Sequence, residues 1–118
     1  MENKRYEYRT PVQIIVDRLQ LPSVELPPAS RGYIYELSAS GCRFESPVLL
    51  KIGQELSLSF VLPGGYTIVN AKARVIRTTQ DEKEPLGVAC QFIDLPEADQ
   101  YKIREFIVWK EAHRESNA

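Results

Sequence analysis

The sequence predicts a mostly β domain, a small antiparallel barrel or sandwich that is closed at one end by a C-terminal helix. Around six short segments are rich in β-branched or alternating apolar residues, and turns with Pro, Gly and Ser separate them. The C-terminal segment changes to good helix formers. The chain has 118 residues, of which 43% are hydrophobic, and this suits one packed domain.

The N-terminal half is predicted to contribute three strands. Residues 12–16 are β-branched and apolar, which favours a strand. A loop is expected from about residue 20 to residue 31, because its prolines cannot continue a central strand. Two short strands, 32–37 and 41–45, are expected on either side of a turn that contains Ser and Gly.

The central hairpin gives the strongest strand pattern. In residues 55–62 every second side chain is apolar, which is typical of a strand with one buried face. The turn 63–65 leads into a long strand over residues 66–79, and residues 86–92 form the last predicted strand. The side chains of the hairpin that are predicted to face inward are Leu56, Leu58, Phe60, Leu62, Val69, Ala71, Ala73 and Val75.

Residues 96–118 are predicted to form a helix and a short tail, with Asp94 as the N-cap and Pro96 in the first turn. The polar face of this helix is narrow and contains Gln100, Arg104 and Glu111. Its apolar residues cover more than the ~100° stripe that packing on one face requires. Either the helix is sunk deeply against the barrel, or its surplus apolar face, with Trp109, contacts a second subunit or a partner protein.

Charge and residue counts exclude several classes of function. Fifteen Lys and Arg against sixteen Asp and Glu give a formal net charge of −1, so the chain lacks the overall field of a protein that coats nucleic acid. The one histidine, His113, lies near the C-terminus and far in sequence from both cysteines. These residues therefore form neither a nucleophile–base pair nor a set of metal ligands with the usual spacing. We expect no catalytic residue, no metal and no cofactor, and therefore no enzyme.

The compartment is inferred from cysteines and apolar runs. Cys42 and Cys90 are expected to be buried, reduced thiols, because a domain of this size rarely needs a disulfide. The polar N-terminus is not followed by the apolar region of a signal peptide, and no apolar run is long enough to span a membrane. We expect a cytoplasmic protein that does not insert into membranes.

The first candidate binding element is an N-terminal arm, residues 1–11, which carries Arg5 and Arg9. In an extended arm these side chains point the same way, about 13 Å apart at about 3.3 Å per residue. Guanidinium groups suit phosphate oxygens and the O6/N7 edge of guanine. On its own this pattern is also compatible with a solvated basic arm.

The second candidate element is the turn from Glu36 to Gly41. Glu36 and Ser38 are expected to share one face of the incoming strand, opposite Leu37, which would face the core. Gly41 permits a positive φ or a close approach of the backbone to a ligand. Ser and Gly are also ordinary turn residues, so the element alone does not define a site.

Taken together and in this order, the R-x-x-x-R arm and a turn of the form [D/N]-x-S-x-x-G resemble the PilZ domain, a bacterial receptor module for cyclic di-GMP. Residues 58–65 and 71–77 are similar to the central hairpin of that family, and residues 86–95 to its closing strand. The resemblance covers about residues 4–110. It implies a flexible arm (1–11), a six-stranded antiparallel PilZ-type β-barrel (12–95) and a C-terminal helix and tail (96–118).

The resemblance also implies roles for single residues. Arg5 and Arg9 match the arginines that grip phosphates and the guanine edge, and Ser38 and Gly41 match the turn that holds guanine. Glu36 departs from the family pattern, because it stands at the Asp/Asn position. It keeps an acceptor oxygen for guanine, but its longer side chain could instead pair with an arginine of the arm and occlude the site.

Two further cations are weaker candidates for the ligand site. Lys4 precedes the arginine pair, and a third cation there would help to hold an intercalated ligand dimer. Arg43 lies two residues after the turn and is equally compatible with an ordinary surface arginine.

The function that the resemblance implies is a cyclic di-GMP receptor or adaptor. Ligand would clamp the arm across the barrel and expose or cover a surface for an unidentified effector protein near the C-terminal helix. The alternative is a PilZ-like protein-interaction module in which Glu36 has weakened or abolished ligand binding. A barrel that binds single-stranded nucleic acid is disfavoured by a pI of about 5.9 and by the lack of a basic strip with aromatic residues. We expect a monomer or a weak homodimer.

Overall fold

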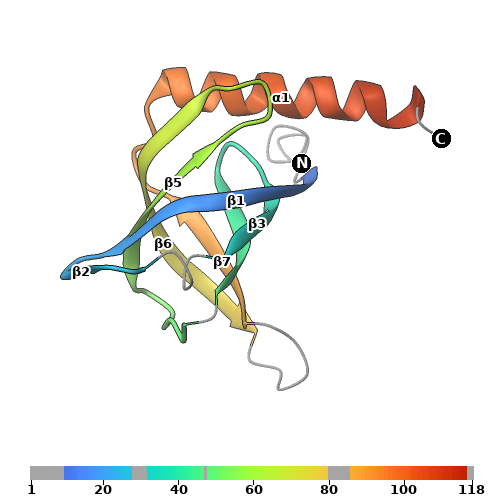
Figure 1. Ribbon diagram of the computed structural model, residues 1–118. Helices are drawn as coiled ribbons and strands as arrows, with labels where there is room; N and C mark the ends of the chain where they lie inside the picture. The colour runs from blue at the N-terminus through green and yellow to red at the C-terminus, as the bar shows by residue number, and fades with distance from the viewer. Residues whose placement is uncertain (1–9, 28–31, 47, 80–85, 117–118) are drawn as a thin grey trace.

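In the computed structural model, six antiparallel strands close into a barrel and one helix lies across one end of it (Figure 1). The structure describes residues 10–27, 32–46, 48–79 and 86–116. The elements are β1 (Thr10–Leu21), β2 (Val24–Glu25), β3 (Tyr33–Leu37), β4 (Gly41–Ser46), β5 (Glu55–Val61), β6 (Thr67–Thr79), β7 (Leu86–Phe92) and α1 (Glu97–Ser116). This confirms the predicted fold class, a mostly β chain with a six-stranded barrel and a C-terminal helix.

The barrel is closed by β1. The strand order is β2-β1-β3-β4-β7-β6-β5, and β1 also pairs with β5. Thr10 lies opposite Leu37 of β3 at one end of β1, and Gln20 lies opposite Ser57 of β5 at the other end. The single long strand β1 therefore closes the barrel by pairing with β3 through its first part and with β5 through its second part.

The predicted loop from residue 20 is wrong in its first part. β1 continues to Leu21 and forms a hairpin with β2, in which Gln20 pairs with Glu25 and Leu21 with Val24. Pro22 lies in the turn between the two strands, where its missing N–H disturbs no strand pairing.

Large apolar side chains fill the barrel. Phe44, Phe60 and Ile34 are completely buried, and packing of this kind is the main favourable contribution to folding. The predicted inner face of the central hairpin is confirmed for Leu56, Leu58, Phe60, Leu62, Ala71, Ala73 and Val75, which are all buried.

The prediction for Val69 is wrong, because β6 carries an extra residue. Val69 is 60% exposed and its neighbour Ile68 is completely buried. Leu58 pairs with Ala71 while Phe60 pairs with Ile68, so three steps on β6 oppose two on β5. Asn70 takes up this bulge with a φ of 53°, and its N–H donates to Ser59 Oγ (2.8 Å). Such a bulge reverses the alternation of the residues on one side of it.

The start of the helix also differs from the prediction. Helix α1 begins at Glu97, and the N–H of Gln100 donates to the carbonyl oxygen of Pro96 (3.0 Å), so Pro96 occupies the cap position. Asp94 is not the N-cap; its φ of 51° places it in the left-handed region, where the chain turns from β7 towards the helix. Asp tolerates this conformation better than most residues.

Helix α1 packs on the barrel through a single apolar stripe. Ile103, Phe106 and Ile107 are buried, whereas Tyr101, Val108 and Trp109 are 62%, 68% and 54% exposed. The helix is therefore not sunk deeply, and an apolar outer face remains on the surface. No helix within the described ranges is long and apolar enough to cross a bilayer.

The two cysteines are free and buried, as predicted. They lie directly opposite each other, Cys42 on β4 and Cys90 on β7. Burial raises the pKa of the Cys90 thiol to about 12, so this thiol is protonated at neutral pH. A protonated thiol is a poor nucleophile.

The docking of the helix is tested by truncating its buried stripe. Ile103→Ala should lower the free energy of unfolding by about 2–5 kcal/mol, because it leaves a cavity between helix and barrel. The matched change on the outer face, Val108→Ala, should stay within about 0.5 kcal/mol of the parent. Urea denaturation measures both, and equal small losses would contradict this packing.

Candidate functional site

The turn between β3 and β4 is held in shape by the Ser38 hydroxyl. Ser38 Oγ accepts the N–H groups of Ser40 and Gly41, both at 3.2 Å. The backbone N–H of Ser38 donates to the carbonyl oxygen of Gly41 (2.9 Å). Ser38 is completely buried, so it does not share the outer face of Glu36 as predicted. In this structure its role is to fix the path of the turn.

Gly41 is required by the neighbouring strand. Its φ is not positive, in contrast to the φ values of Gly32, Gly53, Gly64 and Gly65. A Cβ at Gly41 would lie 2.1 Å from the carbonyl oxygen of Cys90 in β7, a distance no real contact allows. The N–H of Phe92 donates to the carbonyl oxygen of Ser40 (2.8 Å), which holds β7 against the turn. The close approach that the sequence indicated is therefore made to the barrel itself.

Glu36 lies on the outer surface of β3 and pairs across the strands with Arg43 of β4. Arg43 Nε is 3.5 Å from Glu36 Oε1, and the two side chains are 34% and 32% exposed. Nε has no hydrogen-bond partner of good geometry among the described residues, so the contact is electrostatic. An ion pair at this exposure contributes about 0–1 kcal/mol and is easily opened.

A bulge in β3 sets the direction of Glu36. Ile34 pairs with Phe44 and Glu36 pairs with Arg43, so Tyr35 is an extra residue on β3. Tyr35 and Glu36 are therefore both partly exposed, although they are neighbours. Burial raises the pKa of Tyr35, and the Arg43 guanidinium acts against this increase. Arg43 thus lies between two side chains of the bulge.

The start of β1 lies at the same place. Thr10 is opposite Leu37, and Pro11 is opposite Glu36. Thr10 is buried, and its Oγ1 donates to Glu111 Oε2 of helix α1 (3.3 Å). The predicted phosphate-binding residues Lys4, Arg5 and Arg9 lie outside the described residues. The structure therefore brings together the first residues of β1, the turn with Glu36, and the helix (Figure 1).

A cavity of about 330 Å³ lies beside the turn, between β7 and the helix. Its lining includes Ser40 of the turn, Asp94, and Gln100 and Arg104 of the helix. Neither helix residue was predicted from the sequence to belong to a site. The available signal was the narrow polar face of the helix, which contains Gln100 and Arg104 and is turned towards this cavity.

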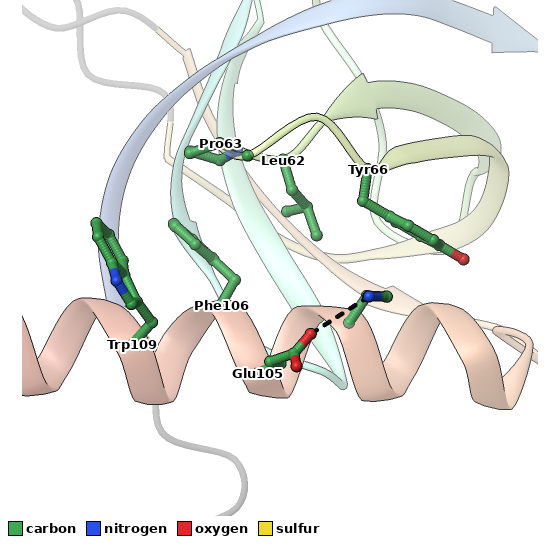
Figure 2. A pocket seen from close by; sticks show the side chains of 8 residues that line it. Leu62, Pro63, Tyr66, Glu105, Phe106 and Trp109 are labelled. Atoms are coloured by element: carbon green, nitrogen blue, oxygen red, sulfur yellow. Dashed lines mark ion pairs between the residues drawn. The ribbon is translucent and has the colours of Figure 1, made fainter.

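A second cavity, of about 460 Å³, lies between the β5–β6 turn and the outer part of the helix. Figure 2 shows Leu62 and Pro63 on the side opposite Phe106 and Trp109, with Tyr66 further along the cavity. Lys102 Nζ and Glu105 Oε1 are 3.5 Å apart at its edge. The cavity is mainly apolar and adjoins the exposed face of α1.

No cluster of three or more His, Cys, Asp or Glu side chains in the described ranges is arranged to hold a metal ion. The chemistry that these surroundings offer is recognition: ionic contacts, hydrogen bonds and apolar walls.

Comparison with known proteins identifies a family model that matches this chain. A family model described as the PilZ domain matches residues 2–109. A comparison with curated protein sequences gives no match.

Solved structures share the fold. The Bacillus subtilis inhibitor of motility (MotI/DgrA) is similar with a TM-score of 0.73 and 21% identity, over 89% of this chain and 50% of that one. YcgR from Escherichia coli in complex with c-di-GMP has a TM-score of 0.71 and 15% identity, over 97% and 50% of the two chains. The PilZ domain of YcgR with c-di-GMP, also from E. coli, has a TM-score of 0.64 and 16% identity, over 97% and 98%. The chain thus spans about half the length of the first two proteins.

The steric reason for Gly41 leads to a stability prediction. Gly41→Ala should cost about 3 kcal/mol or more, because the added methyl group meets the β7 backbone, which cannot move without disturbing the barrel. Gly53→Ala is the control: its φ is +92°, but no heavy atom of the described residues lies within 4 Å of the new Cβ. Its cost should be about 1–2 kcal/mol. Thermal or urea unfolding measures the stability of both variants. A smaller loss of stability for Gly41→Ala than for Gly53→Ala would contradict the close approach of β7.

Proposed function

The chain belongs to the PilZ domain family, and we propose that it binds cyclic di-GMP and transmits the binding event to a partner protein. PilZ domains are non-enzymatic c-di-GMP receptors, which agrees with the expectation that this chain is not an enzyme. The observation that carries the proposal is the pairing of Thr10 with Leu37. It joins the segment that bears the R-x-x-x-R pattern to the barrel at the turn that bears the second motif.

The chemistry of the ligand fits the residues at this place. Cyclic di-GMP carries two phosphate charges and two guanine bases. With a formal net charge of −1, the chain must hold such an anion by locally placed cations. Arg5 and Arg9 supply those cations in the proposal, and Lys4 is a further candidate. Each guanidinium can bind phosphate oxygens or the O6/N7 edge of guanine through two parallel hydrogen bonds.

The turn supplies a rigid wall. The Ser38 hydrogen bonds and the close approach of β7 at Gly41 restrain it, so little conformational entropy should be lost there when ligand binds. Glu36 supplies an acceptor oxygen for guanine N–H groups once its contact with Arg43 opens. Arg43 is then released towards the ligand as an additional cation.

The helix is the proposed output surface. Tyr101, Val108 and Trp109 leave an apolar face exposed on α1, and exposed apolar patches of this kind mark protein contacts. The Thr10–Glu111 hydrogen bond connects the start of β1 to the same helix. Ligand that binds to the residues before Thr10 would bias this contact and thus the position of α1. The proposed partner is an effector protein that binds the exposed face of the helix.

One observation favours a second candidate function. In this structure Glu36 is already engaged by Arg43, and its side chain is one methylene longer than the Asp of the family pattern. If this arrangement persists with ligand present, the chain is a PilZ-like protein-interaction module with weakened or lost c-di-GMP binding.

The melting temperature separates the two functions. A receptor should be stabilised by c-di-GMP but not by GTP or cyclic di-AMP at the same concentration. At a ligand concentration of 100 times Kd the gain is about 2.7 kcal/mol, a shift of several degrees. An unchanged melting temperature at millimolar c-di-GMP would overturn the receptor function and leave the interaction module.

The assignment of the arm has its own test. Arg9→Ala should weaken c-di-GMP binding at least about tenfold, because one charge-assisted contact is lost. Arg77→Ala is the control, since Arg77 is exposed on β6 near the opposite end of the barrel and should bind like the parent. Isothermal titration calorimetry gives both affinities. The same affinity for Arg9→Ala and the parent would contradict the role of the arm.

A further inference from the structure

We propose that the cavity between the β3–β4 turn and helix α1 receives one guanine base of the ligand, whose edge is read by Arg104 and Asp94. This inference rests on the proposed function and extends the site from the turn to the helix.

The position and size of the cavity suit a single base. It has a volume of about 330 Å³ and shares Ser40 with the turn of the proposed ligand site. Ligand pockets usually measure about 300–1,000 Å³, so this one has room for one base and not for the whole dinucleotide. Phe92 and Leu95, which are 9% and 7% exposed, form apolar parts of the lining. Because these two residues are nearly buried, the lining is mainly polar, and a base would be held here chiefly through its hydrogen-bonding edges.

The charges of the lining favour a base over a phosphate group. Asp94 and Arg104 place one negative and one positive side chain on the same cavity. A carboxylate repels phosphate, but it accepts hydrogen bonds from guanine N1–H and N2–H₂. A guanidinium donates to guanine O6 and N7. Guanine presents both edges at once, so a lining with both charges is complementary to it.

Both groups have bonding capacity left for a ligand. Arg104 Nη2 donates to Gln100 Oε1 at 3.5 Å, which is a weak contact for a group with five donors. Within the described ranges, no ion pair joins Arg104 to Asp94 or to another carboxylate. Gln100 itself is anchored, because its Nε2 donates to the carbonyl oxygen of Leu95 (2.8 Å).

The backbone at Asp94 provides an independent observation. Asp94 has a φ of 51°, and it is one of two non-glycine residues with positive φ in the described part of the chain. Backbone conformations of this kind are sparsely populated, and they concentrate at ligand sites. It is not needed to cap the helix, because Pro96 occupies the cap position. The positive φ of Asp94 instead changes the direction of the chain, and the Asp94 side chain lies on the cavity wall.

The inference is tested with two variants, Arg104→Ala and Asp94→Asn. Alanine is well tolerated on an exposed helix position, and Asn tolerates the left-handed backbone at residue 94. The controls are Arg77→Ala and Asp17→Asn, which change exposed charges of the same kind elsewhere on the barrel. Calorimetry measures the affinity of each variant for c-di-GMP, cyclic di-AMP and cyclic di-IMP, whose bases lack N2–H₂.

Arg104→Ala should weaken c-di-GMP binding about tenfold or more and reduce the preference for c-di-GMP over cyclic di-AMP, because adenine has no O6 acceptor. Asp94→Asn should reduce the preference for c-di-GMP over cyclic di-IMP, because a neutral amide with one acceptor oxygen replaces the charged carboxylate and accepts more weakly from N2–H₂. A purely structural role of either residue would lower all affinities together and leave these ratios unchanged.

The outcomes separate this inference from the proposed function. If the parent binds c-di-GMP and both variants keep its affinity and its base preference, the cavity is not a guanine site and the receptor function stands. If the parent does not bind c-di-GMP at all, the proposed function fails, and the guanine site fails with it.

Discussion

Strand β1 pairs with β3 along its first half and with β5 along its second half, and the arrangement of the whole molecule depends on this double pairing. Without it the strands would form an open sheet with two edges, whereas the closed barrel has none among its six strands. The pairing also decides where β1 begins: Thr10 must lie beside Leu37, next to the turn between β3 and β4. The position of the candidate site is thus a consequence of how the barrel closes.

The same closure makes the turn rigid. β7 approaches Gly41 so closely that a side chain there would meet the Cys90 carbonyl, and the Ser38 hydroxyl uses its lone pairs on the turn itself. The Ser and Gly of this motif therefore fix the backbone of the candidate site. The polar side chains around it are Glu36 and Arg43 on the outer surface and Asp94 and Arg104 at the cavity. Helix α1 lines the cavity beside the turn and is hydrogen-bonded to Thr10.

The sequence was sufficient for the existence of the six barrel strands and the helix, although not for the extension of β1 or for β2, because regular alternation in residues 55–62 and the change of composition after residue 95 carry that information locally. It was not sufficient where an extra residue enters a strand. Asn70 moves Val69 to the surface, and a bulge leaves no periodic trace in the sequence. Ser38 was placed on the wrong face because its hydroxyl bonds within the turn.

Arg104 and Asp94 meet Ser40 only through the closed barrel, across more than fifty residues of chain, so no local pattern could assign them. Lys4, Arg5 and Arg9 lie outside the described residues, and their role stays a prediction.

The central claim is that ligand, arm, turn and helix meet at the first residues of β1. Hydrogen–deuterium exchange of the full chain, with and without c-di-GMP, tests it directly, because exchange reports local opening residue by residue. We expect added protection in three segments that are far apart in sequence: the start of β1 with the residues before it, the turn 36–41, and residues 94–111. Protection confined to other parts of the barrel, while c-di-GMP is bound, would contradict it.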